Sequence, residues 1–256
     1  MFARTLVTAT LTAAVLCGCN PDETKVTVNA SALKSAAEGK VATAKVELRL
    51  DSNLPFESEI AELISRKARP FLGKDAEIRI EPTHKDSNSR KGTNNTAKVQ
   101  KEKPPQARFI ANFDIPVGTA AALREAPPGI LQLEYTEKDK TFRLVYGRNM
   151  SPLNSALRKM DSSFALEYPG GYISAFLFSH YETTITVLND EKITLGVAAV
   201  NVNGKGVIAE NIDTHDGSLL IDYGNEVYTG KAPCFMYGGF QQAMPSWSPA
   251  KKAWGK

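Results

Sequence analysis

The sequence is poor in the residues from which most catalytic and metal sites are built. Among its 256 residues there are only three cysteines and three histidines. The common catalytic motifs are missing: the chain has no G-x-S-x-G, no P-loop, no H-E-x-x-H, no C-x-x-C and no dinucleotide-binding fingerprint. The cysteine count also excludes a structural zinc site made of four cysteines. The sequence therefore favours a non-enzymatic protein, and it identifies no catalytic residue, metal ligand or cofactor.

The chain also lacks a strong excess of charge and a long hydrophobic run. Its 31 Lys and Arg residues against 28 Asp and Glu residues give a net charge of +3, which does not indicate a nucleic-acid partner. The apolar stretch Leu6 to Leu16 is shorter than the roughly 20 residues that cross a bilayer, and is typical of an export signal. The 42% hydrophobic content is enough for a sizeable core.

The end of this apolar stretch carries a motif for lipid attachment. The run Leu16-Cys17-Gly18-Cys19 resembles the lipobox of bacterial lipoproteins, in which an aliphatic residue and a small residue precede an invariant cysteine. Leu16 and Gly18 match the positions that the signal peptidase recognises, and Cys19 matches the lipidated cysteine. Cys17 departs from the commonest choices at its position. The resemblance implies that a diacylglyceryl group is attached to the Cys19 sulfur, that the chain is cut before Cys19, and that the new amine is acylated.

This resemblance also implies a location and a membrane contact. Residues 1–18 would be the signal peptide, and we expect residues 19–24 to form a polar tether. Fatty acyl chains on Cys19, such as palmitate, would bind membrane lipid. In lipoproteins sorted between two membranes an aspartate after the cysteine favours the inner membrane, so Asn20 indicates the outer membrane, facing the periplasm. The alternative is an ordinary signal peptide with an incidental cysteine.

The lipobox resemblance also implies how many free thiols the mature chain has. With Cys17 removed and Cys19 acylated, Cys234 is the one remaining thiol. An intramolecular disulfide is then impossible, although the compartment would allow one. We expect Cys234 to be a buried small residue rather than a reactive one.

The body is expected to have an α+β fold, mainly antiparallel β-sheet with two or three short helices. Strict alternation of apolar residues in Val41 to Leu50 predicts a strand. Helical spacing predicts a helix from Glu57 to Arg69 that ends at Pro70 and Gly73. Residues 25–81 would therefore form a strand-helix-strand part.

The rest of the body is predicted to be rich in β-hairpins. Residues 108–240 form this β-rich part, in the same domain or in a second one, and the pair Asn203-Gly204 predicts a tight turn within it. We expect a loosely held tail over residues 241–256. Between the two parts, residues 82–107 are polar and are predicted to form a flexible loop. The basic residues of this loop indicate either a contact with an anionic partner, such as lipid head groups, or simply a solvated connection.

Few side chains of the body stand out as site residues. His84 lies in the polar loop, and His180 follows an apolar run. The short acidic run Asp213 to Gly217, which includes His215, could ligate a cation, but it lacks the spacing of a calcium loop and is typical of a β-turn. The aromatic residues between Tyr168 and Phe178 are more typical of a core than of a ligand site.

The order of features in the body resembles a group of small lipoproteins that phages and prophages of Gram-negative bacteria carry. The shared features are a lipobox cysteine, a strand over Lys25 to Ala30, the following Ser31-Ala32-Leu33, the Val41 to Leu50 strand and the hairpin at Val200 to Gly204. The group has no established activity, so the resemblance implies no catalytic residues.

Three functions are compatible with this reading. The first is a membrane-anchored, non-enzymatic interaction or accessory role in the periplasm, with an envelope or phage protein as the partner and no nucleic acid. The second is a periplasmic hydrolase that acts on an envelope polymer. The third is a structural accessory of a secretion or conjugation machine. Converging carboxylates with raised pKa values would favour the hydrolase, whereas an unpaired sheet edge or apolar patch would favour the other two.

Overall fold

The computed structural model describes residues 22–83, 105–153, 155–156, 181–214, 217–224 and 233–240. Most of these residues lie in β-strands, and three short helices accompany the strands. The expected α+β content is therefore present, with strands in clear excess.

The elements of the first half alternate between strands and helices. They are β1 (Asp22–Asn29), α1 (Ala30–Ala37), β2 (Ala42–Pro55), α2 (Glu59–Leu72), β3 (Glu77–Thr83), β4 (Gln106–Thr119) and α3 (Ala120–Glu125). The second half consists of strands: β5 (Leu131–Thr136), β6 (Thr141–Tyr146), β7 (Tyr181–Leu188), β8 (Thr194–Val202), β9 (Lys205–Asp213), β10 (Leu219–Gly224) and β11 (Phe235–Tyr237). A further helical turn covers residues 150–153.

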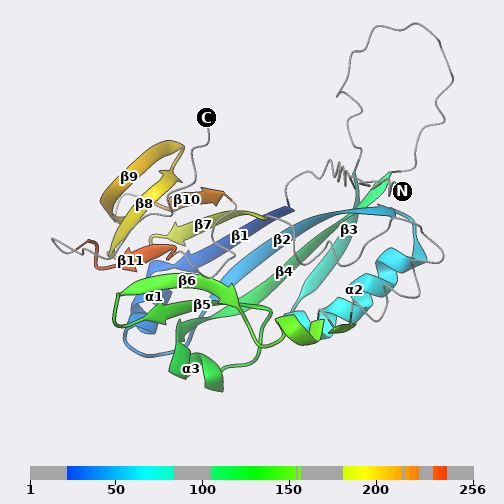
Figure 1. The fold of residues 1–256 in the computed structure, drawn as a ribbon, viewed down its shortest axis with the longest axis horizontal. Coiled ribbons are helices and arrows are strands. Elements are labelled where there is room, and N and C mark those ends of the chain that lie inside the picture. The colour runs from blue at the N-terminus through cyan, green and yellow to red at the C-terminus, as the bar shows by residue number, and fades with distance from the viewer. Residues whose placement is uncertain are drawn as a thin grey trace, which may run out of the picture.

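All eleven strands belong to one sheet, and most of that sheet closes on itself (Figure 1). The strands follow the order β10-β7-β1-β2-β4-β5-β6-β11-β8, and β8 pairs again with β10. Nine strands therefore form a closed sheet. The remaining two strands lie outside this ring, because β3 pairs only with β4 and β9 pairs only with β8 among the described strands.

Closure of the sheet was not predicted from the sequence. Most neighbouring strands are antiparallel, as expected, but β1 pairs with β7 and β4 pairs with β5 in parallel. The β1–β7 pair joins the first strand of the chain to one that starts at Tyr181. Residues 25–81 and 108–240 therefore contribute strands to one shared sheet.

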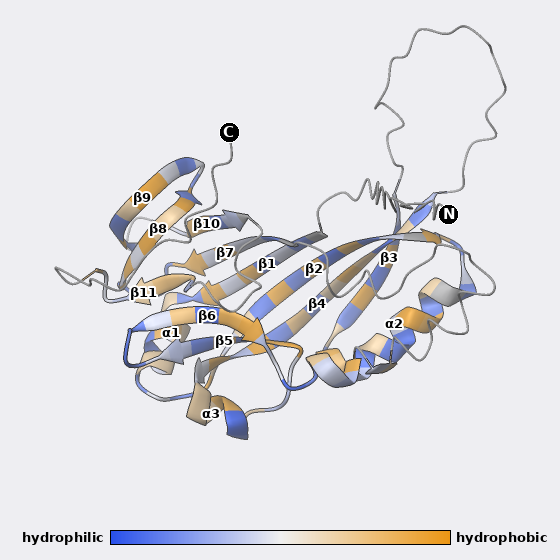
Figure 2. Cartoon of the chain, viewed as in Figure 1, coloured by the Kyte–Doolittle hydropathy of each residue, from blue (hydrophilic) through white to orange (hydrophobic). Residues whose placement is uncertain are grey.

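The strands form because their apolar residues alternate with a period of two. In β2 the side chains of Val46, Leu48 and Leu50 are buried, whereas those of Lys45, Glu47 and Arg49 lie on the outer face. Figure 2 shows this alternation as bands of opposite hydropathy along β2 and β4. The buried faces of the strands meet in one hydrophobic core.

Helix α2 packs beside β3, where the long strands extend past the closed sheet (Figure 1). The helix starts at Glu59, two residues after the predicted Glu57, because the Ser58 side chain caps it by accepting a hydrogen bond of 3.2 Å from the Ala61 amide. The predicted end was wrong: α2 continues through Pro70 to Leu72. Pro70 has no N–H to donate to the Arg66 carbonyl, and the helix ends two residues after it.

Two other predicted boundaries shift. Residues 22–24, which were assigned to the tether, are the first residues of β1 and pair with β2 and β7. The polar segment 82–107 is shorter than predicted at both ends, because β3 extends to Thr83 and β4 begins at Gln106, and these two residues pair. Residues 84–104 lie outside the described part of the chain.

The tight turn predicted at Asn203-Gly204 is confirmed. Both residues have positive φ angles, 49° and 80°, as a two-residue hairpin turn with this sequence requires. The Asn203 side chain also accepts a hydrogen bond from the Leu220 amide at 2.9 Å, which ties the β8–β9 hairpin to β10. The predicted tail, 241–256, lies outside the described residues.

Candidate functional site

The predicted lipid-attachment motif lies just before the first described strand. Leu16, Gly18, Cys19 and Asn20 are outside the described residues, but β1 begins at Asp22, three residues after Cys19. Three extended residues reach only about 10 Å. An anchor at Cys19 would therefore hold the start of β1 within about 10 Å of a bilayer surface.

The outer face of the sheet beside this start is covered by paired charges. The Lys25 ammonium nitrogen lies 3.1 Å from a carboxylate oxygen of Glu23 and 3.8 Å from one of Glu47. The Arg49 guanidinium nitrogens lie 3.4 Å and 2.8 Å from carboxylate oxygens of the same two residues. Cross-strand register produces this arrangement, because Glu23 is opposite Arg49 and Lys25 is opposite Glu47. Each pair is partly exposed, so each contributes little to stability. The four side chains make a polar, solvated surface of near-zero net charge.

A hollow of about 440 Å³ opens on this outer face. We call it the outer hollow. Its polar side chains come from β1, β2, β4 and the start of β3: Lys25, Thr27, Lys45, Glu47, Asp75, Glu77, Asn112 and Asp114. Both acidic and basic groups line it: Lys45 lies opposite Asp114, and Glu47 lies opposite the neutral Asn112. Such a surface suits a polar partner that presents charges of both signs.

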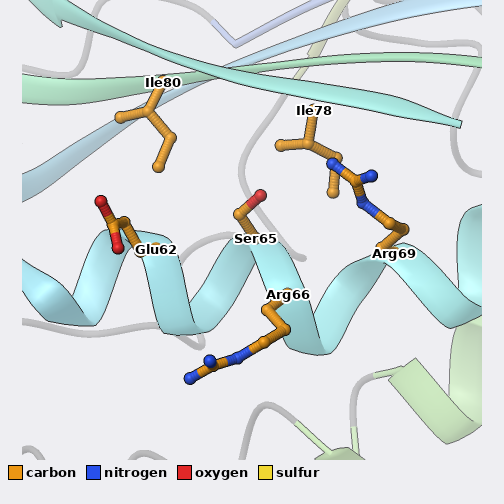
Figure 3. A pocket seen from close by; sticks show the side chains of 6 residues that line it. All are labelled: Glu62, Ser65, Arg66, Arg69, Ile78 and Ile80. Atoms are coloured by element: carbon orange, nitrogen blue, oxygen red, sulfur yellow. The ribbon is translucent and has the colours of Figure 1, made fainter.

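A second hollow, of about 490 Å³, lies between α2 and β3. Figure 3 shows Glu62, Ser65 and Arg69 on the side of α2 that faces Ile78 and Ile80 of β3, while Arg66 points away from the strand. The hollow therefore has an apolar floor and a charged helical rim. Charge of both signs on the rim, Glu62 with Arg69, does not select one class of ligand.

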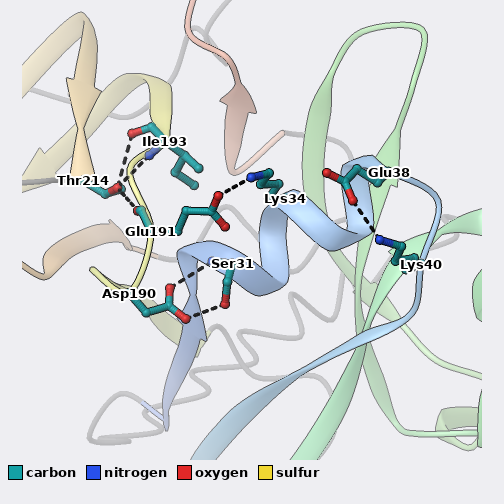
Figure 4. Close-up of polar contacts among 8 residues, drawn as sticks. All are labelled: Ser31, Lys34, Glu38, Lys40, Asp190, Glu191, Ile193 and Thr214. Carbon is teal, nitrogen blue, oxygen red and sulfur yellow. Dashed lines mark hydrogen bonds and ion pairs between the residues drawn. The ribbon is translucent and has the colours of Figure 1, made fainter.

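Helix α1 lies at the end of β1 away from its start (Figure 1), and Figure 4 shows the polar contacts that it makes there. The Ser31 amide donates a hydrogen bond of 2.9 Å to the Asp190 carboxylate, and the Ser31 hydroxyl donates another. Asp190 thus caps the first turn of α1, whose N-cap residue Asn29 makes no side-chain hydrogen bond. Lys34 of α1 forms an ion pair with Glu191, which follows Asp190 in the β7–β8 connection. These contacts bind α1 to the β7–β8 connection.

The electrostatics of this cap follow from its hydrogen bonds. Burial by itself raises the pKa of the Asp190 carboxyl, but hydrogen bonds from the Ser31 hydroxyl and from backbone amides lower it, and the pKa lies below its ordinary value. The hydrogen bond and charge of Glu191 raise the pKa of the Lys34 ammonium. Both groups are therefore charged at neutral pH, and neither is tuned to transfer protons.

The prediction that the Cys234 side chain is buried is confirmed. Cys234 is 2% exposed, and burial raises the pKa of its thiol to about 12. A thiol with so high a pKa is a poor nucleophile at neutral pH. Burial also raises the pKa of Tyr223 well above its ordinary value, with the nearby Cys234 adding to the shift. Cys234 belongs to the core, and Tyr223 is partly buried against it.

The other residues singled out in the sequence do not come together. His84, His180 and His215 and the aromatic residues 168–178 lie outside the described residues. Asp213 accepts a hydrogen bond of 2.5 Å from the Thr194 hydroxyl, so its carboxylate supports the β8–β9 hairpin. Within the described ranges, no three His, Cys, Asp or Glu side chains gather as metal ligands would.

Sequence reasoning missed the capping role of Asp190 and both hollows. The pair Asn189-Asp190 carries a turn signal, but a turn signal does not say which helix the carboxylate will reach. The outer hollow is assembled from four elements and the second hollow from two, so local patterns could not reveal them.

These features define a closed-sheet α+β protein with two surface hollows. The chain matches no protein-family model, and no curated protein or solved structure resembles it significantly. In the described part of the chain, no helix has both the length and the apolar character needed to cross a bilayer.

Proposed function

We propose that the protein is a lipid-anchored, non-enzymatic interaction or accessory protein of the bacterial cell envelope. Acyl chains on Cys19 hold its body on the outer membrane, facing the periplasm, as Asn20 favours. Its partner is an envelope or phage protein, in keeping with the resemblance to lipoproteins carried by prophages.

The observation that carries the proposal is the motif Leu16-Cys17-Gly18-Cys19 just before the folded body. With β1 beginning at Asp22, the tether is too short for the body to act far from the membrane. One acyl chain binds a bilayer only weakly, at about 0.8 kcal/mol per buried methylene, but two or three make attachment effectively permanent. The protein would then work on partners within the envelope.

The outer hollow is the best candidate for the surface that meets this partner. It lies on the strands β1, β2 and β4, next to the anchored end, and it presents Lys45 and Asp114 side by side. Partners of mixed charge can form complementary ion pairs there, which give specificity more than affinity. The paired carboxylates beside it, Glu23 and Glu47, each contact a Lys or an Arg.

The anchor is tested by replacing the acceptor sulfur. We expect Cys19→Ser to move the protein from the membrane fraction to the soluble or unprocessed fraction, with no change in the melting of the body. Cys234→Ser is the matched control, because it removes the other thiol of the mature chain and should leave the protein in the membrane. Mass spectrometry of the mature wild-type N-terminus should show an acylated cysteine.

An unmodified mature N-terminus would overturn the anchor and the location together. A Cys19→Ser protein whose first 18 residues have been removed and that still stays with the membrane after a salt wash would do the same.

The partner surface has a separate test. Crosslinking in intact envelopes, followed by purification, should recover the partner with the wild type and several-fold less of it with Lys45→Glu. Lys138→Glu, an exposed change in the β5–β6 turn, is the control. Equal recovery with all three proteins would exclude the outer hollow.

A further inference from the structure

The outermost strand of the sheet, β9, presents an open edge. β9 pairs with β8 from Lys205 to Asp213, with an interruption at Ile208, and no described strand pairs with its other edge. Figure 1 shows the β8–β9 hairpin at the far end of the molecule from α2. Ile208, in the middle of β9, is 90% exposed. An exposed edge with an apolar residue is a template for another strand.

Edge geometry restricts how a second copy of β9 could add to this edge. In a strand, the backbone N–H and C=O groups of alternate residues point to the same side. Directly opposed residues of an antiparallel pair must both point these groups toward the partner strand or both away from it. For two copies of one strand, this holds only if a residue lies on the two-fold axis. If a peptide bond lies there, each residue is opposed to its chain neighbour, whose groups point the other way. This leaves Ile208, Ala209 and Glu210 as the central candidates.

Only the register centred on Ala209 overlaps the full strand. It places Lys205 opposite the partner's Asp213 at one end, and the symmetric pair forms at the other end. It also brings Ile208 into diagonal reach of the partner's Ile208 and the partner's Ile212 on the same face. The register centred on Glu210 would oppose two carboxylates, and the one centred on Ile208 would lose both ion pairs.

We propose that β9 is a self-association edge, at which two copies of this chain join their sheets as an antiparallel, two-fold symmetric β9–β9 pair centred on Ala209. The charges at the two ends of the strand select a second copy over an unrelated strand. The proposal does not depend on lipid attachment at Cys19.

Cysteine scanning tests the register. The full chain carrying Cys17→Ser and Cys19→Ser leaves Cys234, which is buried, as the only native thiol. Single cysteines are then placed at 207, 208, 209, 210 and 211, with Leu220→Cys on β10 as an exposed control. Directly opposed Cβ atoms are close enough for a disulfide, so crosslinked dimer on oxidation should peak at Ala209→Cys. A peak elsewhere, or no position above the control, would overturn the proposal.

Charge exchange gives an independent test by sedimentation analysis of the full chain. Lys205→Asp and Asp213→Lys should each weaken the dimer about tenfold, since each creates two like-charge contacts. The double exchange should restore the dimer, and thermal melting identifies variants that lose the fold. A double variant as weak as either single one would reject the ion pairs.

The C-terminal segment is the competing occupant, because Asn211 of β9 binds the Phe240 backbone through both side-chain atoms. If only a chain shortened after Phe240 dimerises, the tail occupies the edge and the proposal is wrong for the full chain. Equal dimerisation of the full and shortened chains supports it.

Discussion

The β2–β4 wall and the β6–β11–β8 seam belong to the same closed sheet but are held together differently. β2 and β4 pair in register from Ala42 to Pro55, interrupted by one irregularity. β11, by contrast, has three residues and makes two residue pairs with each neighbour. The wall is therefore secured by backbone hydrogen bonds, and the seam needs another source of stability.

Aromatic packing supplies that stability at the seam. The ring centroid of Phe142 lies 4.9 Å from that of Tyr135 and 5.3 Å from that of Phe235. The Phe142 ring also packs edge-to-face with Tyr237, at a centroid distance of 6.5 Å. Tilted and edge-to-face pairs of this kind add about 0.5–1.5 kcal/mol each beyond burial. A sheet can thus be closed by side chains where its backbone pairing is short.

The largest effect that would test this contrast is expected from Phe142→Ala. Removing this fully buried ring should lower the free energy of unfolding by about 3–5 kcal/mol, measured by urea denaturation. Phe109→Ala, at a buried site on the wall strand β4, is the matched control of similar total cost. Hydrogen exchange should separate them: Phe142→Ala should expose amides of β8 and β11 first. Identical exchange patterns would remove the distinction between wall and seam.

A second way to probe the seam is the thiol of Cys234, which directly precedes β11. Its pKa of about 12 and its burial predict very slow alkylation at pH 8 in the native state and rapid alkylation after unfolding. The stability that the neutral thiol contributes is complete below its ordinary pKa of 9.0 and is lost as the pH rises toward 12. Phe142→Ala should accelerate alkylation more than Phe109→Ala does, and fast labelling of the wild type would show a permanently open seam.

A smaller effect is expected where α1 covers the end of the sheet. Asp190→Ala should cost about 1 kcal/mol, since it removes the cap of an α1 turn that is partly exposed to solvent. Because the pKa of Asp190 is lowered in the folded protein, its contribution is present above the ordinary value of 3.8 and is lost as the pH falls through the folded value. Thermal melting at pH 7 and at pH 3 should show the variant's deficit shrinking at pH 3. Glu137→Ala, in an exposed turn, is the control.

The smallest effect is expected on the outer face of the wall. Lys25→Ala should change the free energy of unfolding by no more than about 0.5 kcal/mol, because its partners Glu23 and Glu47 also contact Arg49. Chemical denaturation in low and high salt measures this. A loss above about 1 kcal/mol would mean that the charge network, and not backbone pairing, secures the wall.

Local patterns in the sequence predicted the wall well. The alternation in Val41 to Leu50 identified most of β2, and two β-rich runs around the turn 137–140 identified the β5–β6 hairpin. Both signals depend on neighbours in the chain, so one sequence is sufficient to read them. The helix end was misplaced because a proline usually marks the end of a helix, whereas here Phe71 and Leu72 follow Pro70 in α2 and pack on the core.

The seam and the hollows could not be predicted in the same way. Three residues, Phe235 to Tyr237, are too few to show alternation, and the β1–β7 pair joins segments that share no local signal. In the outer hollow, Lys45 and Asp114 meet only because of the β2–β4 register. The proposal for Cys19, by contrast, depends on a contiguous motif and needs no knowledge of the fold.

The parallel pairing of β1 with β7 has a consequence for how the molecule is made. Its earliest strand sits in the interior of the sheet order, and one of its two neighbours is synthesised more than 150 residues later. Such distant pairing is slow to form because a long loop must close first. The edge of β1 that pairs with β7 therefore stays unpaired until β7 has been synthesised. Folding can finish only once nearly the whole chain is present.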